Sequence, residues 1–598
     1  MKRGRAGLFS SVFAIALLCA GPARAQSTAP SPRSFYEEES LVKAMQLTHS
    51  ELDLEPEGKI LEGIDVVPLD VIEERDPAPM MLNMFHVTTR EGVVRREVLL
   101  RVGEPYRQYL VDDSARVLRT FRQVSLVVLQ PTRGRTPDRV RLLVVTKDVW
   151  SLRANSDFGI SAKGIDKLKF EPTERNVAGT FDSIFARFEL YPATLTFGAG
   201  VYIPRLDARP LYFSAEANAI VNRERGEPEG TYGQAVIRRP ILSSRQQWAW
   251  AVSSMWRSEI NRRYFNAQVA PFDAPSTPEV EKIPDQYRAR SFTEQLQLSR
   301  SFGLAHKHDF TVGAEVNVRE YQGFDVARYG ALVAADHKRL REPTSDTRSA
   351  PFAAVRFYET RYLRTHDLDT LGLAEDYRLG YDFIFSAYPV TEALGSTRTF
   401  AGFDAFAKYV VRLGDGLAQV AGETMIEAQT DRIPVRTHAA QASLYSPRFF
   451  LGRVVIDGLL LTRPANYLNL RSTIGGESRL RGQPSGALLG ENLVAVNTEL
   501  RSRPLGILAS QVGGALFFDV ADASDEWPPK PKSSAGVGIR LVLPQLDRNV
   551  IRFDIGFPIQ KVPGASVIGF YLALDQAFTV RLPDVAPNLI QPGGALGQ

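Results

Sequence analysis

Cysteine is almost absent from this chain of 598 residues, and the single one is Cys19. It lies in an N-terminal stretch with a basic start, a short apolar run over residues 8–20 and small residues on either side of Arg24, just before Gln26. These are the three parts of a secretory signal peptide, so we expect residues 1–25 to be cleaved on export. An exported chain that starts at Gln26 has no disulfide and no thiol chemistry.

Long apolar runs and excess charge are also missing. No window of about 18 apolar residues occurs, which excludes a membrane-spanning helix. Residues 1–25 hold four bases and no acid, which accounts for the whole formal net charge of +4. The remaining chain is therefore neutral, without the concentrated basic surface that nucleic acid requires. A β-barrel can still be integral to a membrane, because its lipid-facing and lumen-facing residues alternate and dilute the hydropathy.

Catalytic motifs are lacking too. The sequence has no Gly-x-Ser-x-Gly elbow, no phosphate-binding Walker loop and no His-Glu-x-x-His pair. His306 and His308 flank Lys307 in a predicted turn, where two histidines could bind a metal, but a solvated turn explains them better. We therefore predict no enzyme activity, no metal site and no cofactor. An enzyme assembled from scattered residues at the rim of a barrel stays open as an alternative.

Alternating apolar and polar residues dominate the chain from 152 to 578. No helical period interrupts them, which indicates an all-β architecture. Polar, Pro-containing stretches at 271–287 and 335–350 are typical of long loops on one side. The clearest alternating runs cover 195–202, 211–221, 248–256, 292–298, 310–318, 352–357 and 403–411.

The last predicted strand separates a membrane barrel from a soluble sandwich. One face of this strand, which we expect to end at Phe578, is apolar apart from Gln576, whereas the other face is mostly small or polar. A soluble sheet would have a polar outer face, so the pattern favours lipid on one side and a lumen on the other. The apolar face consists of Ile568, Phe570, Leu572, Leu574 and Phe578.

Two segments precede the barrel. Residues 26–57 are rich in Pro, Ser and acidic residues, which predicts a linker. Residues 58–151 predict one small α/β domain with a strand, two helices and two further strands. Thr88 and Glu91 are placed as a capping box for the first helix, and Val111, Ala115 and Leu118 share one face of the second. The predicted strands cover 60–72, 124–129 and 140–145.

Three motifs near the end of the chain resemble those of the BamA/TamA superfamily of outer-membrane assembly and secretion barrels, which includes bacterial surface antigens. They are Arg479-Leu480-Arg481-Gly482, Glu499-Leu500-Arg501 and Phe517-Phe518-Asp519, followed by the last strand. The segment from Val93 to Tyr106 and that from Leu118 to Val124 make the α/β domain similar to one POTRA module. The resemblance implies a transmembrane antiparallel barrel of about 16 strands behind one periplasmic domain.

The resemblance also implies which residues carry function. Arg481 is the arginine at the tip of a loop folded into the lumen, Gly482 is its tight turn, and Asp519 is its partner on the wall. Glu499 and Arg501 extend this network. Phe570 and Phe578 belong to a C-terminal recognition signal that ends in an aromatic residue. Two features depart from the family pattern: Gln483 replaces an aromatic residue, and a Pro- and Gly-rich tail follows at 579–598.

By the same resemblance, the chain handles β-rich client proteins through the POTRA domain and a seam between the first and last strands. Its partners would be outer-membrane lipid, extended clients in the periplasm, and accessory periplasmic proteins or lipoproteins, with no nucleic acid. The alternatives are a two-partner-secretion pore for one dedicated substrate and a passive outer-membrane channel.

Overall fold

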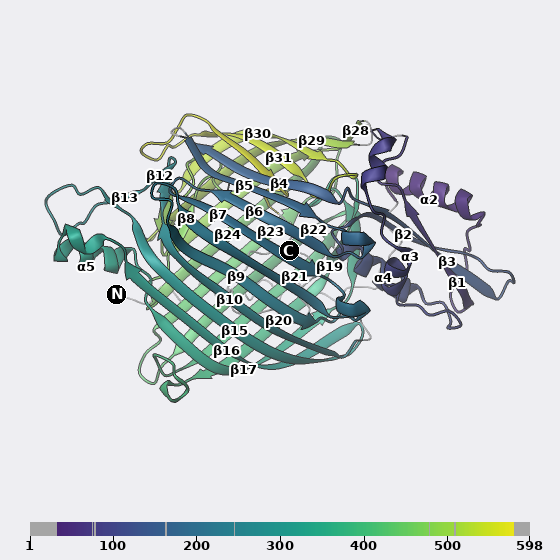
Figure 1. Cartoon of the computed structure of the whole chain (residues 1–598), viewed down its shortest axis with the longest axis horizontal. Helices are drawn as coiled ribbons and strands as arrows, with labels where there is room; N and C mark the ends of the chain where they lie inside the picture. The colour runs from purple at the N-terminus through teal and green to yellow at the C-terminus, as the bar shows by residue number, and fades with distance from the viewer. Residues whose placement is uncertain are drawn as a thin grey trace.

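The computed structural model describes residues 33–578, except 75, 77–78, 162–163, 244–245, 478 and 508–509. The predicted signal peptide and the tail at 579–598 lie outside the described residues. A closed barrel occupies the centre of the molecule, a small α/β domain sits at one end, and the helix α5 (Ala331–Leu340) projects from the other (Figure 1). We call these the domain end and the α5 end. None of the described helices is long and apolar enough to cross a membrane.

The N-terminal domain has a three-stranded sheet in the order β1-β3-β2, with β1 parallel and β2 antiparallel to β3. Its order of elements agrees with the predicted strand, two helices and two strands. On α4 the predicted apolar residues Val111, Ala115 and Leu118 are all buried. The elements are β1 (Ile60–Leu69), η1 (Met80–Phe85), α3 (Glu91–Arg96), α4 (Gln108–Thr120), β2 (Val124–Arg133) and β3 (Arg139–Asp148).

Helix α2 (Phe35–Thr48) corrects the prediction of a linker over 26–57. Ser34 accepts a hydrogen bond from the Glu37 amide, and the Glu37 side chain accepts one from the Ser34 amide, which forms a capping box. Leu41 and Ala44 are buried against the sheet. The capping box predicted at Thr88 is wrong, because α3 begins after Arg90 without a side-chain cap. The Pro- and Ser-rich stretch therefore ends at the helix rather than extending through it.

Twenty strands form the barrel within the described residues, and the expected number of about 16 is wrong. A barrel of 16 strands would need longer connections than this chain has. Several turns at the domain end are short, such as Gly303–Ala305 and Gly414–Asp415, which leaves residues for more strands. The first ten strands are β4 (Leu152–Ser161), β5 (Gly164–Glu174), β6 (Ser183–Leu190), β7 (Thr194–Ile203), β8 (Tyr212–Asn222), β9 (Pro228–Arg239), β10 (Trp248–Arg262), β15 (Gln286–Phe302), β16 (His306–Gly323) and β17 (Asp346–Glu359). The other ten are β20 (Gly380–Val390), β21 (Phe400–Leu413), β22 (Gly416–Ala428), β23 (Val435–Tyr445), β24 (Gly452–Asn466), β27 (Asn492–Ser502), β29 (Ser510–Ser524), β30 (Lys532–Val542), β31 (Ile551–Pro558) and β32 (Gly569–Leu574).

Alternation along β15 shows how the sequence sets the two faces of the wall. Leu296 and Leu298 are about half exposed on the outside, whereas Gln295, Gln297 and Ser299 are buried in the lumen. Each strand pairs with both neighbours around the circle, so the barrel has no edge strand of the kind that an open sheet would expose to hydrocarbon. Apolar residues outside and polar residues inside are the pattern of a membrane barrel.

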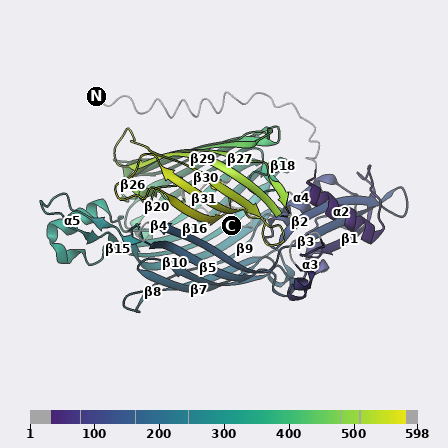
Figure 2. The same ribbon diagram turned by 90° about the horizontal axis from the view of Figure 1, so that it is seen from above.

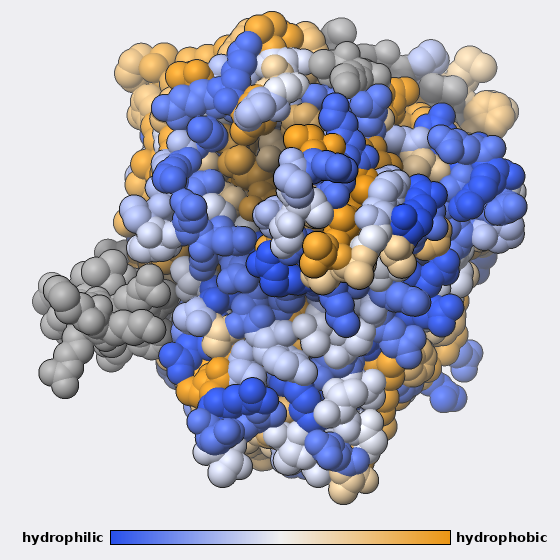
Figure 3. All heavy atoms as spheres, turned by 90° about the vertical axis from the view of Figure 1, so that its left-hand side faces the viewer, coloured by the Kyte–Doolittle hydropathy of each residue, from blue (hydrophilic) through white to orange (hydrophobic). Residues whose placement is uncertain are grey.

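Short elements decorate both ends. At the α5 end, the connections around 264–285 and 324–345 carry β11 (Tyr264–Phe265), β12 (Gln268–Val269), β13 (Pro271–Phe272), β14 (Ile283–Pro284), η4 (Val326–Tyr329) and α5. The predicted loops at 271–287 and 335–350 belong mostly to them. Polar residues cover much of this face, while hydrophobic surface lies along its margin and around a hollow in its upper part (Figure 3). At the domain end, the hairpin of β18 (Tyr362–His366) and β19 (Ala374–Arg378) joins β17 to β20.

The N-terminal domain docks directly on the barrel, as both ribbon views show (Figure 2). Leu371 and Leu373 next to the β18–β19 hairpin share one buried apolar cluster with Leu41 of α2. Glu37 also faces the hairpin: it accepts a hydrogen bond from Arg364 at 3.1 Å and lies 3.3 Å from His366 Nε2. A shared apolar core and buried charges hold the two parts as one body.

Candidate functional site in the barrel lumen

A long connection folds back into the barrel. The lumenal loop, residues 467–491, joins β24 to β27 and contains the short strands β25 (Ser472–Ile474) and β26 (Leu488–Gly490). Gly475 and Gly476 turn the chain with φ of 129° and 71°, which a residue with a side chain rarely adopts. The tip that follows is fully buried, with Leu480 and Arg481 both at 0% exposure. The loop therefore fills part of the lumen.

Arg481 binds the wall of the barrel through its whole guanidinium group. Its Nε and Nη2 donate to the two oxygens of Asp519 on β29 at 2.8 and 2.9 Å, and its backbone amide donates to Asp519 Oδ2 at 3.1 Å. Its Nη1 donates to Glu499 on β27 at 2.6 Å and to Asp554 on β31 at 3.0 Å. The structure thus brings together Arg481, Asp519 and Glu499, the residues that the family resemblance implies for this site. A bidentate pair fixes orientation as well as position.

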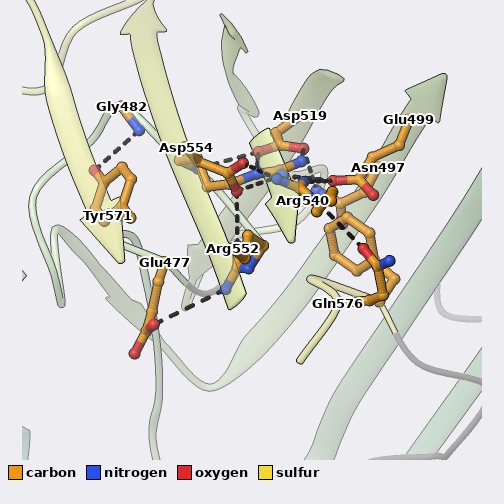
Figure 4. Close-up of polar contacts among 12 residues, drawn as sticks. Glu477, Gly482, Asn497, Glu499, Asp519, Arg540, Arg552, Asp554, Tyr571 and Gln576 are labelled. Atoms are coloured by element: carbon orange, nitrogen blue, oxygen red, sulfur yellow. Dashed lines mark hydrogen bonds and ion pairs between the residues drawn. The ribbon is translucent and has the colours of Figure 1, made fainter. Parts of the chain in front are cut away.

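Further arginines on the wall complete an ionic cluster (Figure 4). Arg501 donates to Glu499 at 2.8 Å, Arg540 donates to Asp554 at 2.6 Å, and Arg552 donates to Asp554 at 2.8 Å. The Arg481 guanidinium also lies 3.6 Å from the ring centre of Phe517. We call this set the lumenal cluster: Arg481, Arg501, Arg540, Arg552, Glu499, Asp519 and Asp554.

Burial makes the lumenal cluster energetically interdependent. Its seven side chains are at most 6% exposed. Taking charges out of water is costly, and the charges here are offset by partners of opposite sign, with Arg481, Glu499 and Asp554 each bound to more than one of them. Removing one member leaves the others with uncompensated charge. The cluster can therefore lock the loop to β27, β29 and β31, and it offers no arrangement of nucleophile and base.

Gly482 lets the loop tip touch the backbone of β31. A Cβ on Gly482 would lie 3.1 Å from backbone atoms of Gly556 and Phe557, and the residue has φ of 99°. A Cβ on Gly556 would lie 2.6 Å from the Gly482 nitrogen. The two glycines thus face each other across the contact. The predicted tight turn at Gly482 is present, and close backbone approach is a second reason for glycine there.

The loop tip is also bonded to the last strand. The Gly482 amide donates to the Tyr571 hydroxyl at 3.0 Å, and that hydroxyl donates to the Gln483 carbonyl at 3.0 Å. The Gln483 side chain donates to the Gln560 carbonyl at 2.7 Å and accepts from the Val562 amide at 3.2 Å. Gln483 therefore fastens the loop tip to the β31–β32 connection through polar contacts.

Phe578 requires a correction. The last strand ends at Leu574, not at Phe578, and Phe578 is buried at 4% exposure rather than facing lipid. Asp575 has φ of 74°, which turns the chain inward, and the Phe578 carbonyl accepts a hydrogen bond from Arg501 at 3.0 Å. Phe570 does face outward, at 41% exposure. The sequence predicts alternation up to Phe578, but Asp575 adopts a left-handed backbone conformation, and the alternation of the strand stops there.

The barrel closes where its last strand meets its first. This seam pairs β32 with β4 through three residue pairs, Phe570 with Ile160, Tyr571 with Gly159, and Leu572 with Phe158. A cavity of about 70 Å³ lies beside it, bounded by β4, β5, β32 and the lumenal loop. Tyr571 lines this cavity and is the residue that joins the seam to the loop tip.

Some members of the site were missed from the sequence. Arg540, Arg552, Asp554 and Tyr571 were not predicted, although Arg552 and Asp554 are two apart and share one strand face. Charged residues with this spacing in an alternating strand point into the lumen, and that signal could have found them. His306 and His308 lie in β16 rather than in a turn. The described residues contain no group of three or more His, Cys, Asp or Glu placed to hold a metal ion.

Comparison with known proteins identifies the C-terminal region. Residues 469–578, which contain the lumenal loop and the last barrel strands, match the Omp85 superfamily domain. No curated protein sequence matches the chain.

Solved structures resemble the chain only loosely. BamA from Haemophilus ducreyi lacking POTRA domains 1–3 is 11% identical, with 88% of each chain covered and a TM-score of 0.35. CdiB from Escherichia coli is 12% identical, with 93% of each chain covered and a TM-score of 0.42. The alcaligin outer-membrane receptor FauA from Bordetella pertussis is 12% identical, covers 72% of this chain and 74% of its own, and scores 0.35. The family assignment therefore rests on the domain match alone: the chain carries an Omp85 superfamily domain over residues 469–578.

Proposed function

We propose that this protein inserts or translocates β-rich client proteins at the outer membrane, with its N-terminal domain in the periplasm as a POTRA-like module. The observation that carries the proposal is the seam, where three residue pairs close the barrel between β32 and β4. A short ladder opens at low cost, and an opened ladder offers two strand edges at membrane depth. Unpaired edges in hydrocarbon recruit any strand that can satisfy them.

The N-terminal domain supplies the first contact in this proposal. In its sheet β1 and β2 are the outer strands, each with one strand neighbour in the described residues, apart from isolated bridges of Ile60 with Pro105 and of Thr132 with Leu52. An extended client can add to such an edge by backbone hydrogen bonds, which require no particular client sequence. The docked domain then delivers the client to the barrel end, because it shares a buried core with the β18–β19 hairpin.

The lumenal loop is the control element in this account. It is locked to three wall strands by the lumenal cluster and bonded to β32 through Tyr571. Movement of the loop and opening of the seam are therefore coupled. We assign Arg481, Gly482, Glu499 and Asp519 the role of holding the closed state, with no covalent step.

A secretion pore for one dedicated substrate is the second candidate, and a passive channel is the third. The lumenal loop and the hairpin at the domain end both occupy space that a passive channel needs open. Secretion through the lumen requires the loop to leave, whereas insertion through the seam requires only β32 and β4 to part. The geometry therefore favours insertion.

Depletion of the protein followed by quantitative outer-membrane proteomics tests this proposal. Broad loss of barrel proteins is the expected result. Loss of a single exported protein would favour the secretion pore, and an unchanged outer membrane together with reduced solute uptake would favour the passive channel.

A further inference from the structure

An apolar segment of the N-terminal domain is exposed where a water-facing surface would be polar. Within η1, Met81, Met84 and Phe85 are 65%, 83% and 71% exposed, and Val87, two residues after η1, is 54% exposed. From Ala78 to Thr89 the sequence contains no Asp, Glu, Lys or Arg, although 23% of the whole chain is charged. Patches of this kind on a folded domain mark an interaction surface.

The segment is folded with its polar residue inward. The Ile72 amide donates to Asn83 Oδ1 at 3.1 Å, and Asn83 Nδ2 donates to the Ile72 carbonyl at 2.8 Å. Asn83 is the one polar side chain of η1, and it is used to fasten the turn to the domain. The methionines and the phenylalanine are left outside. This inverted arrangement is stable next to an apolar medium rather than next to water.

Both ends of the segment are tied to the barrel, on the two sides of the seam. Before η1, Asp76 accepts a hydrogen bond at 2.6 Å from Gln545, in the turn between β30 and β31. After η1, the Val87 carbonyl accepts one at 3.1 Å from Asn176, in the turn between β5 and β6. The Thr89 amide then donates at 2.7 Å to Asp148, the last residue of β3, which fixes the end of the segment to the sheet of its own domain. The apolar turn is thereby held at the rim of the barrel at the domain end.

Exposed apolar residues of the barrel lie at the same rim. Leu152 begins β4, Ile184 lies at the start of β6, and Leu546 lies in the β30–β31 turn, and they are 60%, 52% and 43% exposed. The elements that carry them are those to which the apolar segment is tied, or their direct neighbours in the barrel. The exposed surface of η1 therefore continues the lipid-facing belt of the barrel.

We propose that residues 79–87 insert into the membrane leaflet at the domain end, beside the seam, and bind acyl chains there. Flexible methionine side chains adapt to a fluid surface. The segment anchors the domain to the bilayer and places an apolar wedge in the lipid next to the strands that part. The inference is independent of which client the protein handles.

Lipid-borne quenching of a single fluorophore tests the proposal. The Cys19→Ser chain has no cysteine, so Met84→Cys in that background carries one environment-sensitive label. The matched control is Leu54→Cys, which is 86% exposed on the same domain. Leu54 lies two residues after Leu52, which forms a β-bridge with Thr132. Thr132 is near the C-terminal end of β2, which is the end remote from the barrel. Both labelled proteins are reconstituted in phosphatidylethanolamine and phosphatidylglycerol vesicles that contain doxyl-labelled phospholipid.

We expect several-fold stronger quenching by doxyl lipid at Met84 than at Leu54, and several-fold weaker quenching by aqueous iodide. Adding Met81→Glu and Phe85→Glu should reverse both differences, whereas the control Leu47→Glu on α2, also at an exposed position, should leave them unchanged. Equal iodide access at the two sites without lipid quenching would overturn the proposal. Shielding at Met84 that appears only when an unfolded barrel protein is added would also overturn it, in favour of a client-docking surface.

Discussion

The seam and the wall formed by β10 and β15 differ in what holds neighbouring strands together. Strands β10 and β15 pair through fifteen residue pairs in an unbroken register. Strands β32 and β4 pair through three. Other contacts add to the pairing at the seam: Tyr571 bonds β32 to the lumenal loop, and Asp76 and Val87 of the N-terminal domain bond to barrel turns on the two sides of the seam. Backbone pairing fixes the shape of most of the barrel, whereas side-chain contacts that can be released hold the part proposed to open.

The lumenal cluster should produce the largest effect when it is broken. Arg481→Ala leaves Asp519, Glu499 and Asp554 short of a buried partner, and losing one partner of such a pair costs about 3–5 kcal/mol. We expect the loop to detach and client insertion to fail while the barrel remains in the membrane. An insertion assay, with heat-modifiable gel mobility as the folding control, checks this.

The double variant Arg481→Ala with Asp519→Ala sharpens the result. Because the two side chains act as a unit, the double defect should be little worse than either single one. Simple addition of the two defects would mean that Arg481 and Asp519 work separately.

Docking of the domain should depend next most strongly on Glu37. Burial alone would raise the pKa of this carboxyl, but the hydrogen bond from His366 and the charge of Arg364 outweigh it and lower the pKa to about 2. Because the pKa is depressed in the docked state, ionised Glu37 stabilises docking fully at pH values above its ordinary pKa near 4.5. This stabilisation is lost as the pH falls toward 2. Wild-type docking should therefore be constant from neutral pH down to about 5 and weaken below.

Glu37→Gln should loosen docking at neutral pH by about 1.5–3 kcal/mol, the usual range for a hydrogen bond to a charged group. Limited proteolysis between domain and barrel measures this. The matched variant Glu38→Gln, at an exposed neighbouring position, should behave like wild type. Equal protease resistance of the two variants at neutral pH would contradict the role of Glu37.

The glycine contact at the loop tip should have an intermediate effect. Gly482→Ala both strains a residue with φ of 99° and places a Cβ 3.1 Å from the β31 backbone. Strain of this kind costs about 1–3 kcal/mol. Gly486→Ala is the control, because Gly486 has φ of 63° but its nearest neighbour would be 3.4 Å away. Protease access to the lumenal loop should rise more for Gly482→Ala, and the reverse order would exclude crowding as the reason for glycine there.

The smallest expected effect concerns one hydroxyl. Tyr571→Phe removes the link between β32 and the loop tip, worth about 0.5–1.5 kcal/mol. Amide hydrogen exchange in Gly569–Leu574 should become faster while exchange in β15 is unchanged. Tyr388→Phe serves as control, because the buried Tyr388 hydroxyl makes no hydrogen bond. Identical exchange at the seam in both variants would remove Tyr571 from the closing contacts.

The sequence predicts the barrel and the α/β domain because burial imposes a period on both. Alternation along strands such as β15 requires only that one face meet lipid, and the apolar face of α4 requires only a core. The contact of Arg481 with Asp519 was also predictable from the motifs, although the role of the pair stays a prediction. Long-range partners such as Arg540 and Tyr571 depend on which strands become neighbours across the lumen, and no local pattern specifies that.

Three misses have local causes. The sequence contains the capping box at Ser34 and Glu37, but the Pro- and Ser-rich residues directly before it indicate a linker and conceal the start of the helix. The number of strands was taken from a family resemblance, whereas turn lengths decide it. The inward turn before Phe578 depends on the backbone of Asp575, a single residue in a left-handed conformation. Period-based prediction fails at such single residues.

Locking the seam tests the central claim most directly. In the Cys19→Ser background, Phe158→Cys with Leu572→Cys places a disulfide across paired positions of β4 and β32. Val252→Cys with Leu296→Cys does the same across β10 and β15, where no opening is proposed. Client insertion should stop in the oxidised seam variant, return on reduction, and be unaffected in the control. Full client insertion by the oxidised seam variant would show that the seam does not open, and the proposed mechanism would be wrong.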